Sequence, residues 1–143
     1  MQVFVYEIDG VVCVGSTPNN ENIEDIANLS VPIGVKYLIL DSLDLPKEPQ
    51  ESWYIEDGQI KIDQQKLVEF NRQNMPTLSP IEFDIKLNNA GLYDAVQDLI
   101  KDNFEMRIAY NRATFFSRTA PFIDQARVAL GLTDEQVDEM WTS

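Results

Sequence analysis

Apolar and polar residues alternate along the first part of the chain, which is the pattern of half-buried β-strands. Residues 2–8 and 11–15 both follow it, and they flank the dipeptide Asp9-Gly10. Asp-Gly between two β-rich runs favours a tight hairpin turn, because both residues tolerate a positive φ. A third apolar run at residues 35–40 follows a turn that contains proline and glycine, and it predicts another strand.

A second hairpin is predicted at residues 52–62, where two short strands flank Asp57-Gly58. Two helices accompany these strands. Residues 22–28 place their apolar side chains on one face of a helix. The other helix follows Asp63, a residue that caps helices well, and it ends before Pro76 because the residue before a proline disfavours helical geometry.

The pattern changes after Pro76. The sequence Ser79-Pro80-Ile81-Glu82 combines a serine cap, a proline in the first helical position and a glutamate three residues after the cap. A conflicting signal follows, since the apolar residues alternate as in a strand, at Ile81, Phe83, Ile85 and Leu87. The start signal favours a helix over this segment.

Three further helices are predicted from apolar spacing. Residues 92–100 carry apolar side chains at intervals of three and four, which marks an amphipathic helix. Residues 104–116 are predicted as another helix, and residues 121–130 as a third that ends at Gly131. The sequence Thr133-Asp134-Glu135-Gln136 is a second capping box, so a last helix begins there.

Together these elements predict an α+β protein with two domains. Residues 1–75 would form a β-rich domain with a small antiparallel sheet and one or two helices. Residues 76–143 would form a helical domain, a bundle of four or five short helices. A hydrophobic content of 44% is enough for a substantial core.

The charge balance is strongly acidic, with 24 acids against 11 bases and a net charge of −13. Such a chain repels nucleic-acid phosphates and anionic membranes, so we expect neither as a direct partner. The acidic charge is better explained by a basic protein partner or by a need for solubility at high concentration. No run approaches the length of a transmembrane helix, and the N-terminal residues lack the basic region of a secretory signal. The sequence therefore predicts a soluble protein made in the cytoplasm.

Residues suited to catalysis are scarce. The chain has no histidine, which removes the commonest general base and metal ligand. Its single cysteine, Cys13, is predicted as a buried strand residue. Four acids in one loop could suggest a cation site, but their spacing favours a solvated loop, at Asp41, Asp44, Glu48 and Glu51. We expect no enzyme activity, no metal and no cofactor.

Arginine and aromatic residues gather in one stretch of the second half, and this stretch is the candidate partner-binding site. Arginine and aromatic side chains are enriched at protein interfaces. The candidate residues, with a tryptophan near the end of the chain, are Arg107, Arg112, Phe115, Phe116, Arg118 and Trp141. The alternative is that the aromatic rings belong to the core and the arginines pair with nearby acids.

Two blocks of the sequence resemble small proteins from bacteriophage and prophage tail regions. The first runs from Ile26 to Pro46 (IANLSVPIGVKYLILDSLDLP) and continues at Trp53 and in the GQIKID sequence at 58–63. The second begins with LSPIEF at 78–83 and ends with LGLTDEQVD at 130–138. Between them the GLYD sequence at 91–94 and RIAY at 107–110 belong to the same resemblance.

The resemblance implies a non-enzymatic tail structural protein or a tail-fibre assembly protein, in the manner of a chaperone, whose partner is a tail or tail-fibre protein. Such a protein is made in the host cytoplasm and can end in the virion tail. A second hypothesis is an acidic phage inhibitor of a host defence or nucleic-acid-binding protein, which imitates DNA. A third is a hydrolase that uses carboxylates such as Glu56 and Asp57.

Overall fold

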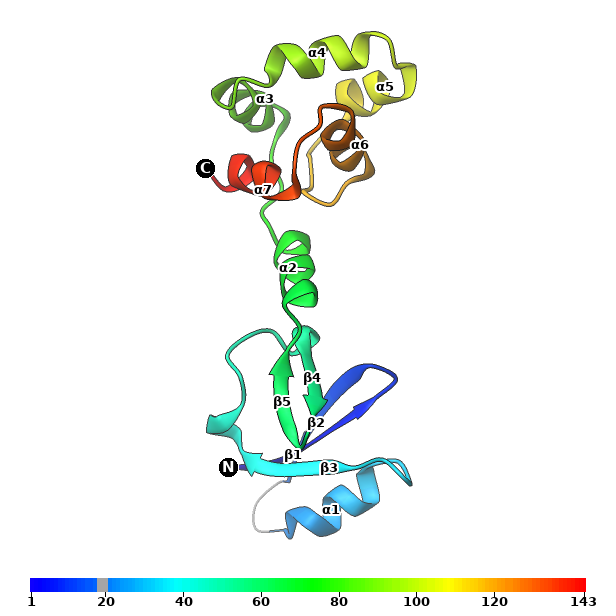
Figure 1. The fold of residues 1–143 in the computed structure, drawn as a ribbon, viewed down its shortest axis with the longest axis vertical. Coiled ribbons are helices and arrows are strands. Elements are labelled where there is room, and N and C mark those ends of the chain that lie inside the picture. Colours follow the sequence, from blue (N-terminus) through cyan, green and yellow to red (C-terminus); the bar gives the residue numbers. More distant parts are fainter. Residues whose placement is uncertain (18–20) are drawn as a thin grey trace. The chain divides into compact units, whose positions relative to one another are not determined.

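The computed structural model describes residues 1–17 and 21–143 (Figure 1). The chain forms two compact units, Met1–Phe70 and Asn71–Ser143, and each is described here by itself. The first holds antiparallel sheets with a helix, and the second is built from short helices packed together. The predicted α+β class is confirmed. The division falls slightly before the boundary expected from the sequence, within a helix.

A three-stranded antiparallel sheet forms the centre of the first unit. Its strands are β1 (Gln2–Ile8), β2 (Val11–Ser16) and β3 (Tyr37–Asp41), in the order β2-β1-β3. Asp9 and Gly10 connect β1 to β2 with φ angles of 51° and 76°, the positive values that the Asp-Gly signal predicts. Cys13 lies half-buried in β2.

Each face of this sheet has its own cover. Helix α1 (Ile23–Ser30) packs against one face, where Phe4, Ile23 and Ala27 are buried together. The hairpin of β4 (Trp53–Glu56) and β5 (Gln59–Ile62) contributes to the cluster on the opposite side, where Val3, Val5 and Trp53 are buried. Successive side chains of a strand point to opposite faces, so β1 supplies residues to both clusters. Two short 3₁₀ helices lie between β3 and β4, at Ser42–Asp44 (η1) and Gln50–Ser52 (η2).

Helix α2 (Gln64–Gln73) follows the hairpin. The predicted cap is present, because the Asp63 carboxylate accepts the backbone N–H of Lys66 at 3.1 Å. This bond satisfies a free N–H group at the start of the helix.

The second unit surrounds one apolar cluster with five helices. They are α3 (Pro80–Asn89), α4 (Tyr93–Lys101), α5 (Phe104–Arg112), α6 (Pro121–Ala129) and α7 (Asp134–Thr142). Both predicted capping boxes are formed, by Ser79 with Glu82 and by Thr133 with Gln136. In α3 the alternating apolar residues separate into two pairs: Phe83 and Leu87 are buried, whereas Ile81 and Ile85 are exposed.

One predicted element was too long. Helix α5 ends at Arg112 and does not reach Phe116, because Ala113 adopts an extended backbone with φ −65° and ψ 132°. Phe116 instead pairs with Leu78 in an isolated antiparallel bridge, through backbone hydrogen bonds of 2.8 and 2.7 Å. This bridge brings the segment before α3 beside the segment after α5 and turns Phe116 into the core.

Candidate protein-binding surface

Three of the six candidate site residues lie inside the second unit. Phe116 and Arg118 are each 4% exposed, and Trp141 is 2% exposed. The indole N–H of Trp141 donates to the carbonyl oxygen of Pro76 at 2.7 Å, so its polar atom is also used within the unit. These residues cannot offer a surface to a partner. The alternative considered for them, packing within the protein, is correct.

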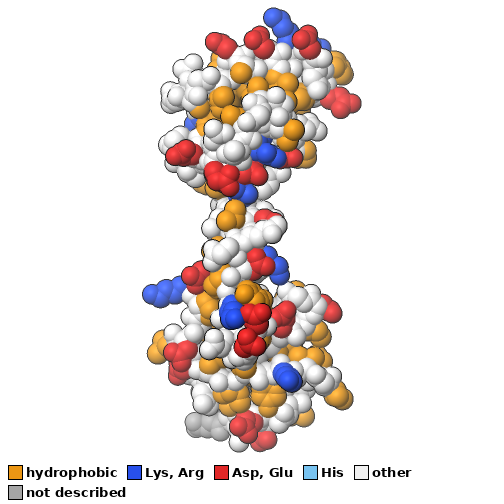
Figure 2. All heavy atoms as spheres, in the orientation of Figure 1, with side chains coloured by type: hydrophobic (Ala, Val, Ile, Leu, Met, Phe, Trp, Pro, Cys, Tyr) orange, Lys and Arg blue, Asp and Glu red, His pale blue; other side chains and the backbone are white. Residues whose placement is uncertain are grey.

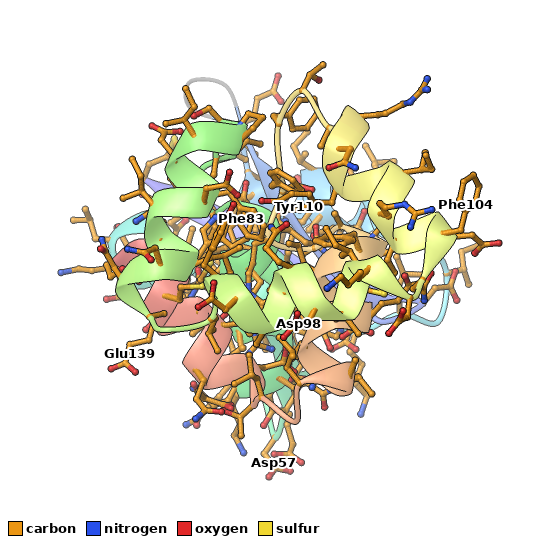
Figure 3. The ribbon with its side chains drawn as sticks, turned by 90° about the horizontal axis from the view of Figure 1, so that it is seen from above. Asp57, Phe83, Asp98, Phe104, Tyr110 and Glu139 are labelled. Atoms are coloured by element: carbon orange, nitrogen blue, oxygen red, sulfur yellow. The ribbon has the colours of Figure 1, made fainter. Side chains whose placement is uncertain are left out.

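Phe116 belongs to a cluster of aromatic rings. Its ring stacks on Phe83 with 4.2 Å between centroids, and Trp141 lies 5.9 Å from Phe83. Tyr110 joins the cluster, and its hydroxyl donates to the Asp84 carboxylate and accepts from the Gln97 amide. Burial, together with the hydrogen bond to Asp84, raises the pKa of Tyr110. Figure 3 shows Phe83 and Tyr110 near the middle of the helices in this view.

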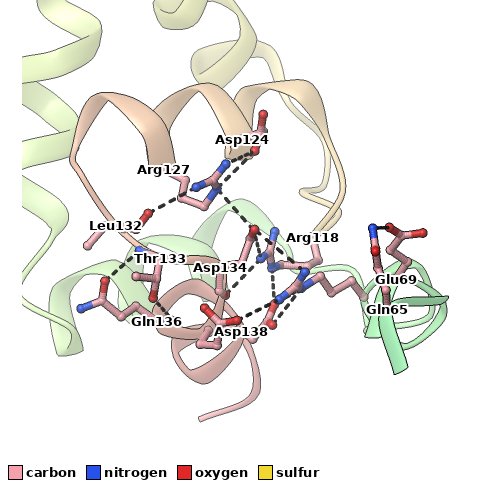
Figure 4. Close-up of polar contacts among 12 residues, drawn as sticks. Gln65, Glu69, Arg118, Asp124, Arg127, Leu132, Thr133, Asp134, Gln136 and Asp138 are labelled. Atoms are coloured by element: carbon pink, nitrogen blue, oxygen red, sulfur yellow. Dashed lines mark hydrogen bonds and ion pairs between the residues drawn. The ribbon is translucent and has the colours of Figure 1, made fainter. Parts of the chain in front are cut away.

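Arg118 is the centre of an ion-pair network at the start of α7 (Figure 4). Its guanidinium donates to the Asp138 carboxylate at 2.7 Å and to the Asp134 carboxylate at 3.0 Å. Arg72 donates to Asp138 at 2.9 Å, and Arg127 lies 3.3 Å from Asp134. Three arginines from different segments therefore hold the first turns of one helix.

The network affects the ionisation of Asp134. The hydrogen bond from Arg118 is the main cause that lowers the pKa of Asp134, and the positive charges of Arg72 and Arg127 act in the same direction. Arg118 itself is buried, and a buried guanidinium needs carboxylate partners to offset its lost hydration. Its role is structural, as the alternative interpretation of the arginine-rich stretch expected.

Of the remaining candidates, Arg112 and Phe115 are exposed and Arg107 is half-buried. Arg107 and Arg112 lie on α5 together with Phe104 and Ile108, and Phe115 follows three residues after the end of the helix. Along α5, Phe104, Arg107, Ile108 and Arg112 follow intervals of three and four and so lie on one side of the helix. We call these four residues, together with Phe115, the α5 patch. Three of its side chains are apolar and unusually open to solvent, with exposed fractions of 66% for Phe104, 36% for Ile108 and 59% for Phe115.

Contacts within the α5 patch hold its first turn in place. The guanidinium of Arg107 lies 5.5 Å from the centre of the Phe104 ring, a cation–π arrangement. Arg107 also donates to the carbonyl oxygen of Lys101 at 3.1 Å. Asn103 caps the helix by accepting the backbone N–H of Met106 at 3.1 Å. In Figure 3 Phe104 points away from the other helices.

The arginines of the second unit fall into two groups. Arg72, Arg118 and Arg127 are paired with carboxylates. Neither Arg107 nor Arg112 has an ion pair with any of the residues that the structure describes. The α5 patch can thus offer two guanidinium groups and two phenylalanine rings to carboxylates and apolar groups of another protein.

Phe104 and Ile108 were missed as site residues, since their spacing in the sequence resembles that of core residues. The sequence does contain a signal that could have identified them, because the opposite side of this helix is also apolar. There Met106 and Tyr110 already supply the buried face of α5, so a second apolar stripe has no core to enter.

Acidic side chains have a different distribution. On the face of each unit drawn in Figure 2 they lie singly or in small groups among apolar, basic and neutral side chains. Several have local partners: Asp41 accepts the backbone N–H of Leu43, Glu56 pairs with Lys61 at 2.5 Å, and Asp134 and Asp138 belong to the arginine network. Asp57 occupies the hairpin turn with φ 52°.

Comparison with known proteins gives no relative: no family model, no curated protein and no solved structure matches the chain. Within residues 1–17 and 21–143, no helix is long and apolar enough to cross a membrane.

Proposed function

We propose that this protein is a non-enzymatic binding protein of a phage tail, either a structural component or a chaperone-like assembly factor for tail fibres. It holds a tail or tail-fibre protein through the α5 patch. The observation that carries this proposal is the combination in the patch of exposed phenylalanine rings with two arginines that lack carboxylate partners among the described residues, in a chain of net charge −13.

The composition of the patch supports binding in energetic terms. Moving one phenylalanine side chain out of water contributes about 1.5–3 kcal/mol, so burial of the exposed Phe104 and Phe115 rings by a partner would stabilise the complex. Arginine beside aromatic rings is a frequent composition of the residues that dominate binding energy. An arginine can also form two parallel hydrogen bonds with a carboxylate, which fixes the orientation of the partner.

The choice of partner rests on the resemblance of the two sequence blocks to phage tail proteins. On this proposal the protein is made in the host cytoplasm and meets a newly made tail component there. It then leaves the finished fibre as an assembly factor, or stays in the virion as a tail component. The scarcity of catalytic residue types in the sequence favours binding over chemistry.

The DNA-mimic hypothesis requires acids in rows at the spacing of phosphates on one face. The acids seen in Figure 2 are dispersed, and four of them in the second unit face arginines, at Asp124, Asp134, Glu135 and Asp138. No observation on the molecule favours mimicry over protein binding, so the tail-protein hypothesis is the one we develop.

Co-expression with a tail-fibre protein of the same phage tests the proposal. We expect the two proteins to co-purify, and the double variant R107E/R112E to weaken the complex by at least about tenfold, because it replaces attraction for carboxylates with repulsion. The matched control is K36E/K47E, which changes the charge equally at two exposed lysines of the first unit.

Two results would overturn the proposal. If the proteins never associate and deletion of the gene leaves infectious particles, the tail function is wrong. If the complex forms but R107E/R112E and K36E/K47E weaken it equally, the α5 patch is not the binding surface.

A further inference from the structure

Strand β3 is an edge of its sheet, and the hydrogen-bond pattern defines what this edge presents. Ser42 donates its backbone N–H to the Met1 carbonyl at 2.8 Å, in register with the β1–β3 pairing. In an antiparallel pair, bonded and non-bonded positions alternate. Leu38 and Leu40 therefore bond β1, and the backbone groups of Tyr37, Ile39 and Asp41 point away from it.

These outward backbone groups are unpaired. Among the described residues, no backbone or side-chain group bonds the N–H or the C=O of Tyr37, Ile39 or Asp41. Two outward groups elsewhere in this unit are bonded to side chains. The Gln50 amide donates to the carbonyl of Val12 on the opposite edge at 2.7 Å, and Glu7 accepts the N–H of Ile55 at 2.8 Å. An unpaired edge is a template for another strand.

A groove runs beside this edge. Its volume is about 280 Å³, and its walls come from β3, from the end of η1 and the segment after it, and from the β4–β5 turn with the start of β5. The lining residues on β3 are Leu38, Ile39 and Leu40, all half-buried, and Asp44 and Pro46 form part of the far wall. The apolar walls suit alternate side chains of an extended chain that pairs with β3.

Charge indicates what kind of chain this is. Residues 1–70 hold 13 acidic and 4 basic side chains, a net charge of −9. Asp44 lines the groove, whereas the carboxylate of Asp41, at the end of the strand, is paired with the N-terminal ammonium at 3.3 Å. A second copy of the same unit would bring two such charges together, which opposes pairing of β3 with itself. A basic segment would be attracted instead.

We propose that the open edge of β3 binds an extended, basic segment of a partner protein by strand addition. The backbone of the segment pairs with Tyr37, Ile39 and Asp41. Its apolar side chains enter the groove, and lysine or arginine side chains face the acids around it. This site lies on the first unit and does not depend on the α5 patch of the second, so either can stand without the other.

A blocked peptide of alternating lysine and valine, about seven residues long, is a suitable probe. Its addition to the ¹⁵N-labelled protein is expected to shift the amide resonances of Tyr37, Ile39 and Asp41 and to slow their hydrogen exchange. The amides of Leu38 and Leu40 already bond β1, so their exchange should change much less. The same peptide with glutamate in place of lysine should not bind.

Two variants test the site further. Ile39→Pro removes an N–H that points outward and leaves the ladder with β1 intact, so we expect it to abolish binding. D44K changes only a side chain of the groove wall, so it tests the site even if Ile39→Pro fails to fold. We expect D44K to weaken peptide binding at least about tenfold. R107E/R112E should bind the peptide like the unmodified protein, which separates this site from the proposed tail function.

Three outcomes would overturn the inference. The first is the absence of saturable shifts at β3. The second is equal binding of the lysine and glutamate peptides. The third is a concentration-dependent dimer, seen by sedimentation, that D44K leaves intact and that protects Ile39, since the edge would then belong to a second copy.

Discussion

The two units bury apolar side chains differently, and the difference decides what each can recognise. The first splits its core between two faces of a sheet, with four buried residues in each cluster, whereas the second holds thirteen buried residues in one cluster. A sheet leaves backbone groups unpaired at its edge, and a helix bonds them internally. The first unit can therefore bind a chain through its backbone, and the second offers only side chains.

The largest effect that would separate the units is expected from Phe83→Ala. Phe83 is 3% exposed and stacks on Phe116, so its loss should destabilise the second unit by about 3–5 kcal/mol. Each unit contains one tryptophan, Trp53 or Trp141. Labelling with 5-fluorotryptophan gives one ¹⁹F signal per unit. In Phe83→Ala the midpoint of urea unfolding should move to a lower urea concentration for the Trp141 signal alone.

Ile85→Ala is the matched control for Phe83→Ala, because Ile85 lies on the same helix and is 55% exposed. Its expected effect is below about 0.5 kcal/mol. Equal shifts of the Trp53 and Trp141 signals in Phe83→Ala would contradict the independence of the two units.

Arg118→Met should have the next largest effect. It leaves Asp134 and Asp138 without their buried partner, and we expect a loss of about 2–4 kcal/mol in the second unit. Both carboxylates are partly exposed, which keeps the loss below that of a fully buried pair. Urea unfolding followed by the Trp141 signal measures it. The control is Arg112→Met, which removes an arginine that has no ion pair among the described residues and should change stability little. A similar loss in both variants would mean that the network does not stabilise the unit.

Gly15→Ala is the corresponding test of the first unit. Gly15 pairs with Phe4 across the sheet, and a Cβ at this position would lie 2.1 Å from the Phe4 ring. The ring must move out of a closely packed cluster, at a cost of about 1–3 kcal/mol. The Trp53 signal should report this loss and the Trp141 signal should not, while Ser16→Ala serves as control at an exposed neighbour. An unchanged Trp53 transition would mean that Phe4 is loosely packed.

The smallest expected effect is a pH dependence of the second unit that arises at Asp134. The pKa of Asp134 is lowered by Arg118 in the folded state, so its contribution to stability is present above the unfolded pKa of about 3.9 and is lost as pH falls through the folded pKa. Asp134 is 39% exposed, so solvent screening keeps the contribution below about 1 kcal/mol.

Urea midpoints of the Trp141 signal between about pH 2 and pH 5 measure this dependence. D134N should reduce the decrease of the urea midpoint that occurs as the pH is lowered. E139Q, which changes an exposed acid of the same helix, should leave that decrease unchanged. Since the chain has no histidine, we expect little change between about pH 5 and pH 8. A D134N profile that matches the unmodified protein would show that Asp134 does not carry the effect.

Local signals made much of the fold predictable. Asp9-Gly10 and Asp57-Gly58 set their hairpins by themselves, since the turn geometry depends on those residues alone. The capping boxes at Ser79 and Thr133 are equally local. The end of α5 was not predictable in this way, because it depends on pairing with Leu78, which is far away in the sequence.

The candidate site was predictable only in part, for the same reason. Phe115 and Phe116 are neighbours in the sequence, yet one is 59% exposed and the other 4%. Which of them enters the core is decided by the bridge to Leu78. Arg118 and Arg112 are likewise indistinguishable by type, and only the position of α7 gives Arg118 its carboxylates.

The arginine network also has a consequence for the timing of folding during synthesis. Arg72 and Asp138 are 66 residues apart, so the second unit cannot close until α7 has left the ribosome. The first unit has all of its strands long before that point. We expect a nascent chain halted before Asp134 to resist protease over residues 1–70 and to be cut after them, an order that pulse proteolysis of stalled chains would reveal.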